Sequence, residues 1–80
     1  MTKDDFVEKI ENGSDIMFSV SGKQFTILTW MDDGIAIGEQ HPNDGDLQYY
    51  DTAEDLVERF MIDGKPLGAI ASNIKITQYS

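Results

Sequence analysis

The sequence predicts an α+β fold: an antiparallel sheet of about four to five strands, a β-meander, with two to three short helices packed on one face. Three observations favour this class. Short segments alternate apolar and polar residues, as half-buried strands do. Turn residues separate these segments at hairpin spacing. Two segments with apolar residues at helical spacing each follow a threonine that can cap a helix. A chain of 80 residues is the size of one domain, so residues 1–80 are expected to form a single domain.

The first helix is predicted to begin after Thr2, whose side chain can cap it with Asp5 as the second residue of a capping box. Phe6, Val7 and Ile10 fall at helical spacing and form one apolar stripe of this helix. Gly13 is expected to end it in the left-handed conformation that glycine adopts readily.

A hairpin is predicted next. Residues 15–21 alternate in polarity, and Ser21–Gly22 fits a two-residue turn. Such a turn fixes the register and places two apolar pairs opposite each other on one face, Phe18 with Phe25 and Ile16 with Ile27. The agreement between turn and pairing supports the hairpin.

A second turn is predicted at residues 32–34. A three-residue loop with Gly34 in the left-handed position would place Met31 opposite Ile35 and Thr29 opposite Ile37. One face of the resulting three-stranded meander is then apolar and forms the expected core, with Ile16, Phe18, Phe25, Ile27, Met31, Ile35 and Ile37. The opposite face carries Met17, Leu28 and Trp30 among polar neighbours.

The rest of the chain is predicted to add one exposed loop, two strands and two helices. Residues 39–46 contain no apolar side chain and indicate the loop. A fourth strand follows over 47–51, with Tyr49 and Tyr50 on opposite faces. Thr52 can cap the second helix. Residues 61–62 fit either a helix end or an extended segment. A short helix is expected from Pro66, and a last strand over 74–79.

The net charge of −9 is distributed unevenly along the sequence. No lysine or arginine lies between Lys23 and Arg59, whereas nine acidic residues do: Asp32, Asp33, Glu39, Asp44, Asp46, Asp51, Glu54, Asp55 and Glu58. The other six acids and six bases cancel, so residues 24–58 hold the whole excess. This charge disfavours direct binding to nucleic acids and to anionic membranes, and it predicts a basic protein surface as partner.

Catalytic chemistry has little support in the residues. The chain has no cysteine and one histidine, His41, in a polar loop, and no nucleophile elbow or phosphate-binding glycine loop accompanies it. We therefore expect no enzyme activity and no cofactor. His41 with Asp44 and Asp46 offers one nitrogen and two oxygen ligands, which leaves a metal-dependent protein as an alternative. No secretion signal and no membrane-length apolar segment occurs, so a cytoplasmic location is expected.

Two aromatic residues are candidate interface anchors. Trp30 falls on the predicted open face of the sheet, where it is either exposed or covered by another segment. Tyr50, beside Asp51, could form part of an interaction edge.

Two stretches carry a resemblance to known sequences. Residues 52–60 (TAEDLVERF) followed by 63–67 (DGKPL) resemble small uncharacterised proteins of Firmicutes and their phages, and residues 15–20 (DIMFSV) with 22–25 (GKQF) are similar to the same group. This resemblance implies no activity. In size and acidity alone the chain is also similar to phage-borne anti-CRISPR proteins and to nuclease immunity proteins.

The sequence therefore favours a non-enzymatic acidic protein-binding module, a monomer or weak homodimer. In its sharper form the hypothesis is a stoichiometric inhibitor whose carboxylates imitate nucleic-acid phosphates and occupy a basic groove. The alternatives are a small housekeeping or assembly protein that binds through an apolar face or a sheet edge, and the metal-dependent protein that uses His41.

Overall fold

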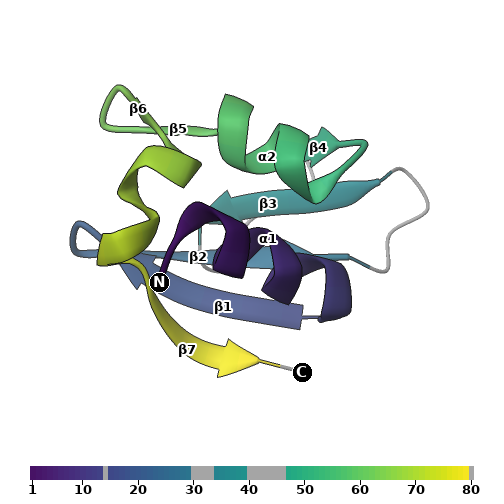
Figure 1. Cartoon of the computed structure of the whole chain (residues 1–80), viewed down its shortest axis with the longest axis horizontal. Helices are drawn as coiled ribbons and strands as arrows, with labels where there is room; N and C mark the ends of the chain where they lie inside the picture. The colour runs from purple at the N-terminus through teal and green to yellow at the C-terminus, as the bar shows by residue number, and fades with distance from the viewer. Residues whose placement is uncertain (14, 30–33, 40–46, 80) are drawn as a thin grey trace.

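The computed structural model describes residues 1–13, 15–29, 34–39 and 47–79. A five-stranded antiparallel sheet is covered on one face by three short helices (Figure 1). The predicted fold class is confirmed. The elements in chain order are α1 (Lys3–Asn12), β1 (Asp15–Val20), β2 (Lys23–Leu28), β3 (Ile35–Glu39), β4 (Gln48–Tyr50), α2 (Ala53–Arg59), β5 (Met61–Ile62), β6 (Lys65–Pro66), the 3-10 helix η2 (Leu67–Asn73) and β7 (Lys75–Tyr79).

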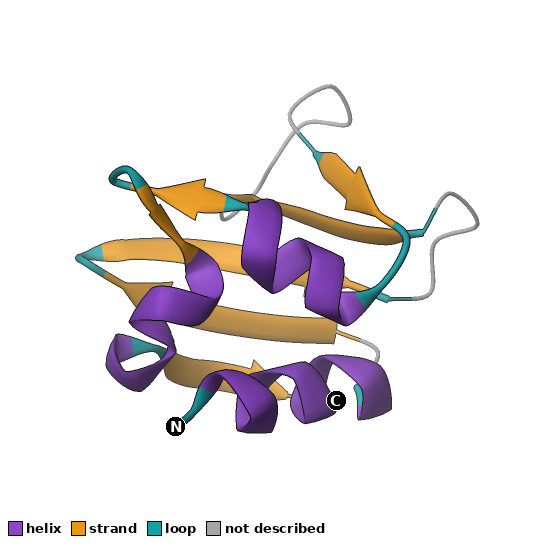
Figure 2. Cartoon of the chain, turned by 45° about the horizontal axis from the view of Figure 1, so that its top comes forward, coloured by secondary structure: helices purple, strands orange, loops and turns teal. Residues whose placement is uncertain are grey.

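The strand order in the sheet is β4-β3-β2-β1-β7. The first four strands form the expected meander, and the last strand returns to pair with the first. Figure 2 shows α1, α2 and η2 side by side in one layer over the sheet. The strands β7 and β4 are the two edges, and no helix lies against the opposite face of the sheet in the described part of the chain.

The first hairpin has the predicted register. Phe18 pairs with Phe25 and Ile16 with Ile27. Ser21 and Gly22 both have positive φ, 54° and 77°, which is the geometry of a type I′ turn. This turn matches the right-handed twist of the strands, so the local turn and the apolar pattern select the same pairing.

The predicted register between β2 and β3 is wrong by two residues. Ile37 lies opposite Ile27, not opposite Thr29, so the connection is longer than the three residues expected. A slip of two residues keeps every side chain on its original face, because side chains alternate with a period of two. The apolar pattern therefore could not distinguish the two registers. Ile37 is on the core face as predicted, and Met31 lies outside the described residues.

The first helix has the predicted capping box: the Thr2 hydroxyl accepts a hydrogen bond from the Asp5 N–H, and the Asp5 carboxylate accepts one from the Thr2 N–H. Gly13 ends the helix, but its φ of −101° is extended rather than left-handed, which corrects the expected conformation. Glycine is needed here for space. An added Cβ would lie 3.0 Å from the Lys9 carbonyl oxygen and 3.1 Å from the Tyr79 ring.

Residues 61–62, which fitted either a helix end or an extended segment, are extended and form β5. This strand pairs with β6 in a small separate hairpin. The turn of the hairpin has positive φ at Asp63 (54°) and Gly64 (82°). Tyr49 and Tyr50 lie on opposite faces of β4, as predicted. Thr52 caps α2 through its hydroxyl, which accepts a hydrogen bond from the Asp55 N–H at 3.0 Å.

One apolar core lies between the sheet and the helices. All four phenylalanines take part, and their rings form a continuous line of contacts. Phe6 of α1 meets Phe18 edge-on at 5.4 Å between ring centroids, Phe18 stacks on Phe25 at 5.4 Å, and Phe25 meets Phe60 edge-on at 5.8 Å. The line connects both α-helices to the central hairpin and holds the helix layer against the sheet.

Candidate functional site

Five of the nine acidic residues predicted to form a partner-binding face lie in the described part of the chain. Four of these are on or next to α2, namely Asp51, Glu54, Asp55 and Glu58, and the fifth is Glu39. The other predicted site residues lie outside the described residues: Asp32, Asp33, Asp44 and Asp46, the aromatic Trp30, and His41 of the alternative metal site.

The cap, the dipole and the residue spacing of α2 determine where its acidic side chains lie. Thr52 begins the helix, and Glu54 and Asp55 fall in the first turn, where negative charge is favoured by the helix dipole. Glu58 lies one turn after Glu54, on the same side of the helix. Leu56 and Val57 point into the core, so the carboxylates are left on the outer surface.

Glu39 does not join this group. It ends β3, whereas the start of the same strand lies beside Tyr50 and hence close to Asp51. Four residue steps along a strand separate Glu39 from Ile35, a distance of about 13 Å. Glu39 instead lies opposite Phe25 at the far end of the β2–β3 pair.

Two acids of α2 have basic partners. The Lys3 ammonium lies 3.0 Å from Oε1 of Glu58, and Nε of Arg59 lies 3.8 Å from Oδ1 of Asp55. The second pair joins residues four apart, which lie one turn apart on the same side of the helix. The hydrogen bond to Glu58 and the charge of Glu58 raise the pKa of the Lys3 amino group, and the charges of Glu54 and Asp4 add to this effect.

The first helix adds a second set of carboxylates, which belong to the part of the sequence whose acids and bases are equal in number. Lys3 at the start of α1 pairs with Glu58 near the end of α2, so the two helices run antiparallel. The exposed or half-exposed acids of the two helices therefore lie on one layer, with Asp5 and Glu8 on the side of α1 that is next to Tyr79 of β7. We call these seven residues the helical acidic surface: Asp4, Asp5, Glu8, Glu11, Glu54, Asp55 and Glu58.

One acid of α1 and one acid that precedes α2 come together at one end of the helix layer. Glu11 and Asp51 line a shallow hollow of about 350 Å³ together with Ile10, Thr52 and Ala53. Glu11 is distant from Asp51 in sequence, and only the packing of α1 against α2 brings them to one hollow. The sequence contained the acids of α1, but their neighbourhood depends on a tertiary contact.

The two adjacent tyrosines occupy different environments. Tyr50 faces the helices, packs against the core and donates a hydrogen bond from its hydroxyl to Oε1 of Gln48 at 2.9 Å. Burial raises the pKa of the Tyr50 hydroxyl, and the charge of Arg59 partly offsets this rise. Tyr49 has the more exposed ring, on the face of the sheet that lies away from the helices.

The described residues build neither a metal-binding cluster nor a membrane-spanning helix. Across residues 1–13, 15–29, 34–39 and 47–79, no three histidine or acidic side chains gather closely enough to hold a metal ion. No helix in those ranges is both long and apolar enough to cross a membrane. The arrangement that the described residues do build is an exposed surface of carboxylates, which is suited to pairing with cationic groups.

No protein-family model, curated protein or solved structure matches this chain.

Proposed function

We propose that this protein is a non-enzymatic, cytoplasmic protein-binding module that inhibits a nucleic-acid-binding protein, such as a nuclease, by occupying its basic groove stoichiometrically. The observation that carries the proposal is the helical acidic surface. The helices α1 and α2 hold seven acidic and three basic residues, and two of the bases, Lys3 and Arg59, already pair with acids of the same surface. A basic groove would supply the counter-charges that the chain lacks.

The physical argument is electrostatic complementarity. A groove lined with arginine and lysine concentrates positive potential, and carboxylates at helical spacing present negative charges at several points, as a phosphate backbone does. Such surfaces accelerate association and select partners more than they add raw affinity. Repulsion between neighbouring carboxylates disfavours folding slightly, and binding to cations would relieve it.

The test is affinity capture of partners from a cell lysate by the immobilised protein, followed by identification of the captured proteins. The variant Asp51→Asn, Glu54→Gln, Asp55→Asn, Glu58→Gln removes four charges without changing side-chain size, and we expect it to lose nucleic-acid-binding partners that the wild type retains. The control Glu54→Asp, Glu58→Asp keeps the charge and should capture the same partners. Capture by the wild type should weaken as salt rises, because exposed charge pairs are screened.

Two results would defeat the proposal. One is equal capture by the wild type and the four-amide variant. The other is capture of no nucleic-acid-binding protein by either. For a captured partner, the wild type must also displace a labelled oligonucleotide at a one-to-one ratio.

The open face of the sheet favours a second candidate, a housekeeping or assembly protein. Leu28 lies opposite Ala36, and Ala36 lies opposite Tyr49, so a line of uncharged side chains crosses three strands without a helix above it. Ala36 is fully buried, Leu28 is half-buried and Tyr49 is 39% exposed, so the accessible part of this line is chiefly at β4. Met17 lies on the same face. This candidate predicts a homodimer or a complex that is insensitive to salt, and sedimentation at low and high salt distinguishes it from the inhibitor.

A further inference from the structure

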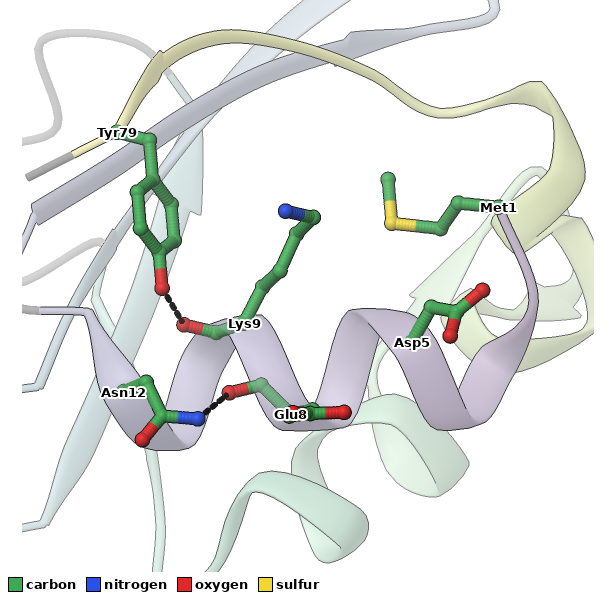
Figure 3. Close-up of a pocket in the computed structure, with 6 residues that line it drawn as sticks. All are labelled: Met1, Asp5, Glu8, Lys9, Asn12 and Tyr79. Carbon is green, nitrogen blue, oxygen red and sulfur yellow. Dashed lines mark hydrogen bonds between the residues drawn. The ribbon is translucent and has the colours of Figure 1, made fainter.

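A groove of about 330 Å³ runs along the side of α1 that faces away from α2, between this helix and the end of β7. Figure 3 shows the six residues that line it: Met1, Asp5, Glu8, Lys9, Asn12 and Tyr79. Five of them come from the first twelve residues, and the sixth, Tyr79, comes from the last strand. Tyr79 is brought to the groove by the pairing of β7 with β1.

The Tyr79 ring is held in place from two directions. Its hydroxyl donates a hydrogen bond to the Lys9 carbonyl oxygen at 3.0 Å. Gly13 leaves room for the ring edge, since a Cβ there would lie 3.1 Å from Cε2 of Tyr79. The residue is nevertheless 43% exposed, so a fixed aromatic ring is available at the surface.

A cation already lies over this ring. The Lys9 ammonium is 5.2 Å from the ring centroid, within the range of a cation–π interaction. Figure 3 shows the Lys9 side chain reaching into the space between Tyr79 and Met1. The protein itself therefore shows what kind of group the groove accommodates, namely a positive charge on an aliphatic stem.

The chemistry of the groove favours a guanidinium over an ammonium group. The lining holds two carboxylates, Asp5 and Glu8, together with the ammonium of Lys9 and the amino-terminal residue Met1. A guanidinium group is planar and weakly hydrated, and it stacks on an aromatic ring while pairing with a carboxylate. Arginine therefore suits this lining better than a second lysine does.

We propose that the groove binds an arginine side chain of a basic protein partner, with the guanidinium over Tyr79 in place of the Lys9 ammonium and paired with the carboxylate of Glu8 or Asp5. This inference rests on the proposed function, for which it supplies a specific anchoring site. Lys9 then acts as an internal competitor that occupies the ring in the free protein.

The test uses a peptide of alternating arginine and glycine with four arginines and blocked ends, titrated into the isotope-labelled protein and followed by NMR. Lys9→Gln removes the competitor. Lys65→Gln makes the same charge change on β6, outside the groove, and is the matched control. We expect Lys9→Gln to tighten binding about threefold beyond any effect of Lys65→Gln, the size of one exposed cation–π interaction. Equal effects of the two variants would overturn the proposal.

The ring is tested separately. Tyr79→Leu should weaken peptide binding about threefold, whereas Tyr79→Phe keeps the aromatic face and should bind as the wild type does. An otherwise identical peptide with lysine in place of arginine should bind more weakly to the wild type. If Tyr79→Leu binds as tightly as the wild type while remaining folded by circular dichroism, the groove is not the site.

Failure of this inference can be told apart from failure of the proposed function. If the four-amide variant loses its partners while Tyr79→Leu keeps them at full affinity, the acidic surface binds without the arginine site. If instead the peptide binds the groove as described but no nucleic-acid-binding protein is captured, the arginine site exists and the inhibitor function fails.

Discussion

The ammonium group of Lys3 lies 3.0 Å from Oε1 of Glu58 and joins the first turn of α1 to the last turn of α2. Its stem lies across Gly68 of η2, where an added Cβ would be 3.1 Å from both Cγ and Cδ of Lys3. One lysine of α1 thus reaches both of the other helices of the layer. Its positive charge also interacts with the carboxylates of Glu54 and Asp4, which help to raise the pKa of the Lys3 amino group.

Lys3 should make stability sensitive to alkaline pH. Its pKa is raised above 10.5 in the folded state, so its contribution is present below pH 10.5 and is lost as the pH rises through the folded-state pKa. We expect the urea midpoint of Lys3→Met to fall less between about pH 9 and pH 11.5 than that of the wild type. Lys75→Met, which removes an exposed lysine of β7, is the control. Parallel curves for the wild type and Lys3→Met would contradict this role.

A side chain at positive φ can lower stability through backbone strain and through steric overlap with its neighbours. Substitutions at Gly34 and Gly22 distinguish these two effects. Both have positive φ, 115° and 77° respectively. An added Cβ at Gly34 would lie 2.6 Å from the Tyr50 carbonyl oxygen, whereas at Gly22 it would meet nothing within 4 Å. Gly22→Ala should therefore cost about 1 kcal/mol of unfolding free energy from backbone strain, and Gly34→Ala about 2–5 kcal/mol. Urea unfolding measures both, and similar losses would show that the β3–β4 contact is not tight.

Phe18 is the centre of the aromatic line. It contacts Phe6 and Phe25 and is completely buried. Phe18→Ala should lower the free energy of unfolding by about 3–5 kcal/mol, which is a large part of the total for a small domain. Met17→Ala, one residue earlier but on the open face, should cost much less. Equal losses would mean that the two faces of β1 are not as different as their burial indicates.

Loss of the Thr52 cap should destabilise α2, the helix that carries Glu54, Asp55 and Glu58. The Thr52 hydroxyl accepts a hydrogen bond from the Asp55 N–H, and Thr52→Ala leaves that donor without its partner. We expect a loss of about 1 kcal/mol, and Thr52→Ser should retain most of the stability because serine caps equally well. Thermal unfolding compares the two. A serine variant as unstable as the alanine variant would point to packing of the threonine methyl group instead.

Much of the fold could be predicted because local signals agree with each other. At the first hairpin, the Ser21–Gly22 turn and the apolar pairs select one register. Both helix caps at Thr2 and Thr52 follow from short-range hydrogen bonding that the sequence reveals. The register of Ile37 was not predictable in the same way, because a slip of two residues leaves the core face unchanged.

The candidate site was less predictable because it depends on contacts between distant parts of the chain. Counting charges along the sequence placed the whole excess in residues 24–58. The structure brings Lys3 to Glu58 and Glu11 to the hollow of Asp51, so α1 and α2 share one surface. The groove at Tyr79 likewise joins the first helix to the last strand. No local pattern in the sequence indicates either neighbourhood.

The line of four phenylalanine rings has a consequence for how the molecule opens. Phe6 of α1 meets Phe18 edge to face, and Phe60, directly after α2, meets Phe25 in the same way. Lifting either helix away would break one of these contacts and expose buried rings on both sides, so the two helices and the hairpin are expected to open as one cooperative unit. The amide protons of α1, α2 and the hairpin are therefore expected to exchange with solvent in a single cooperative event.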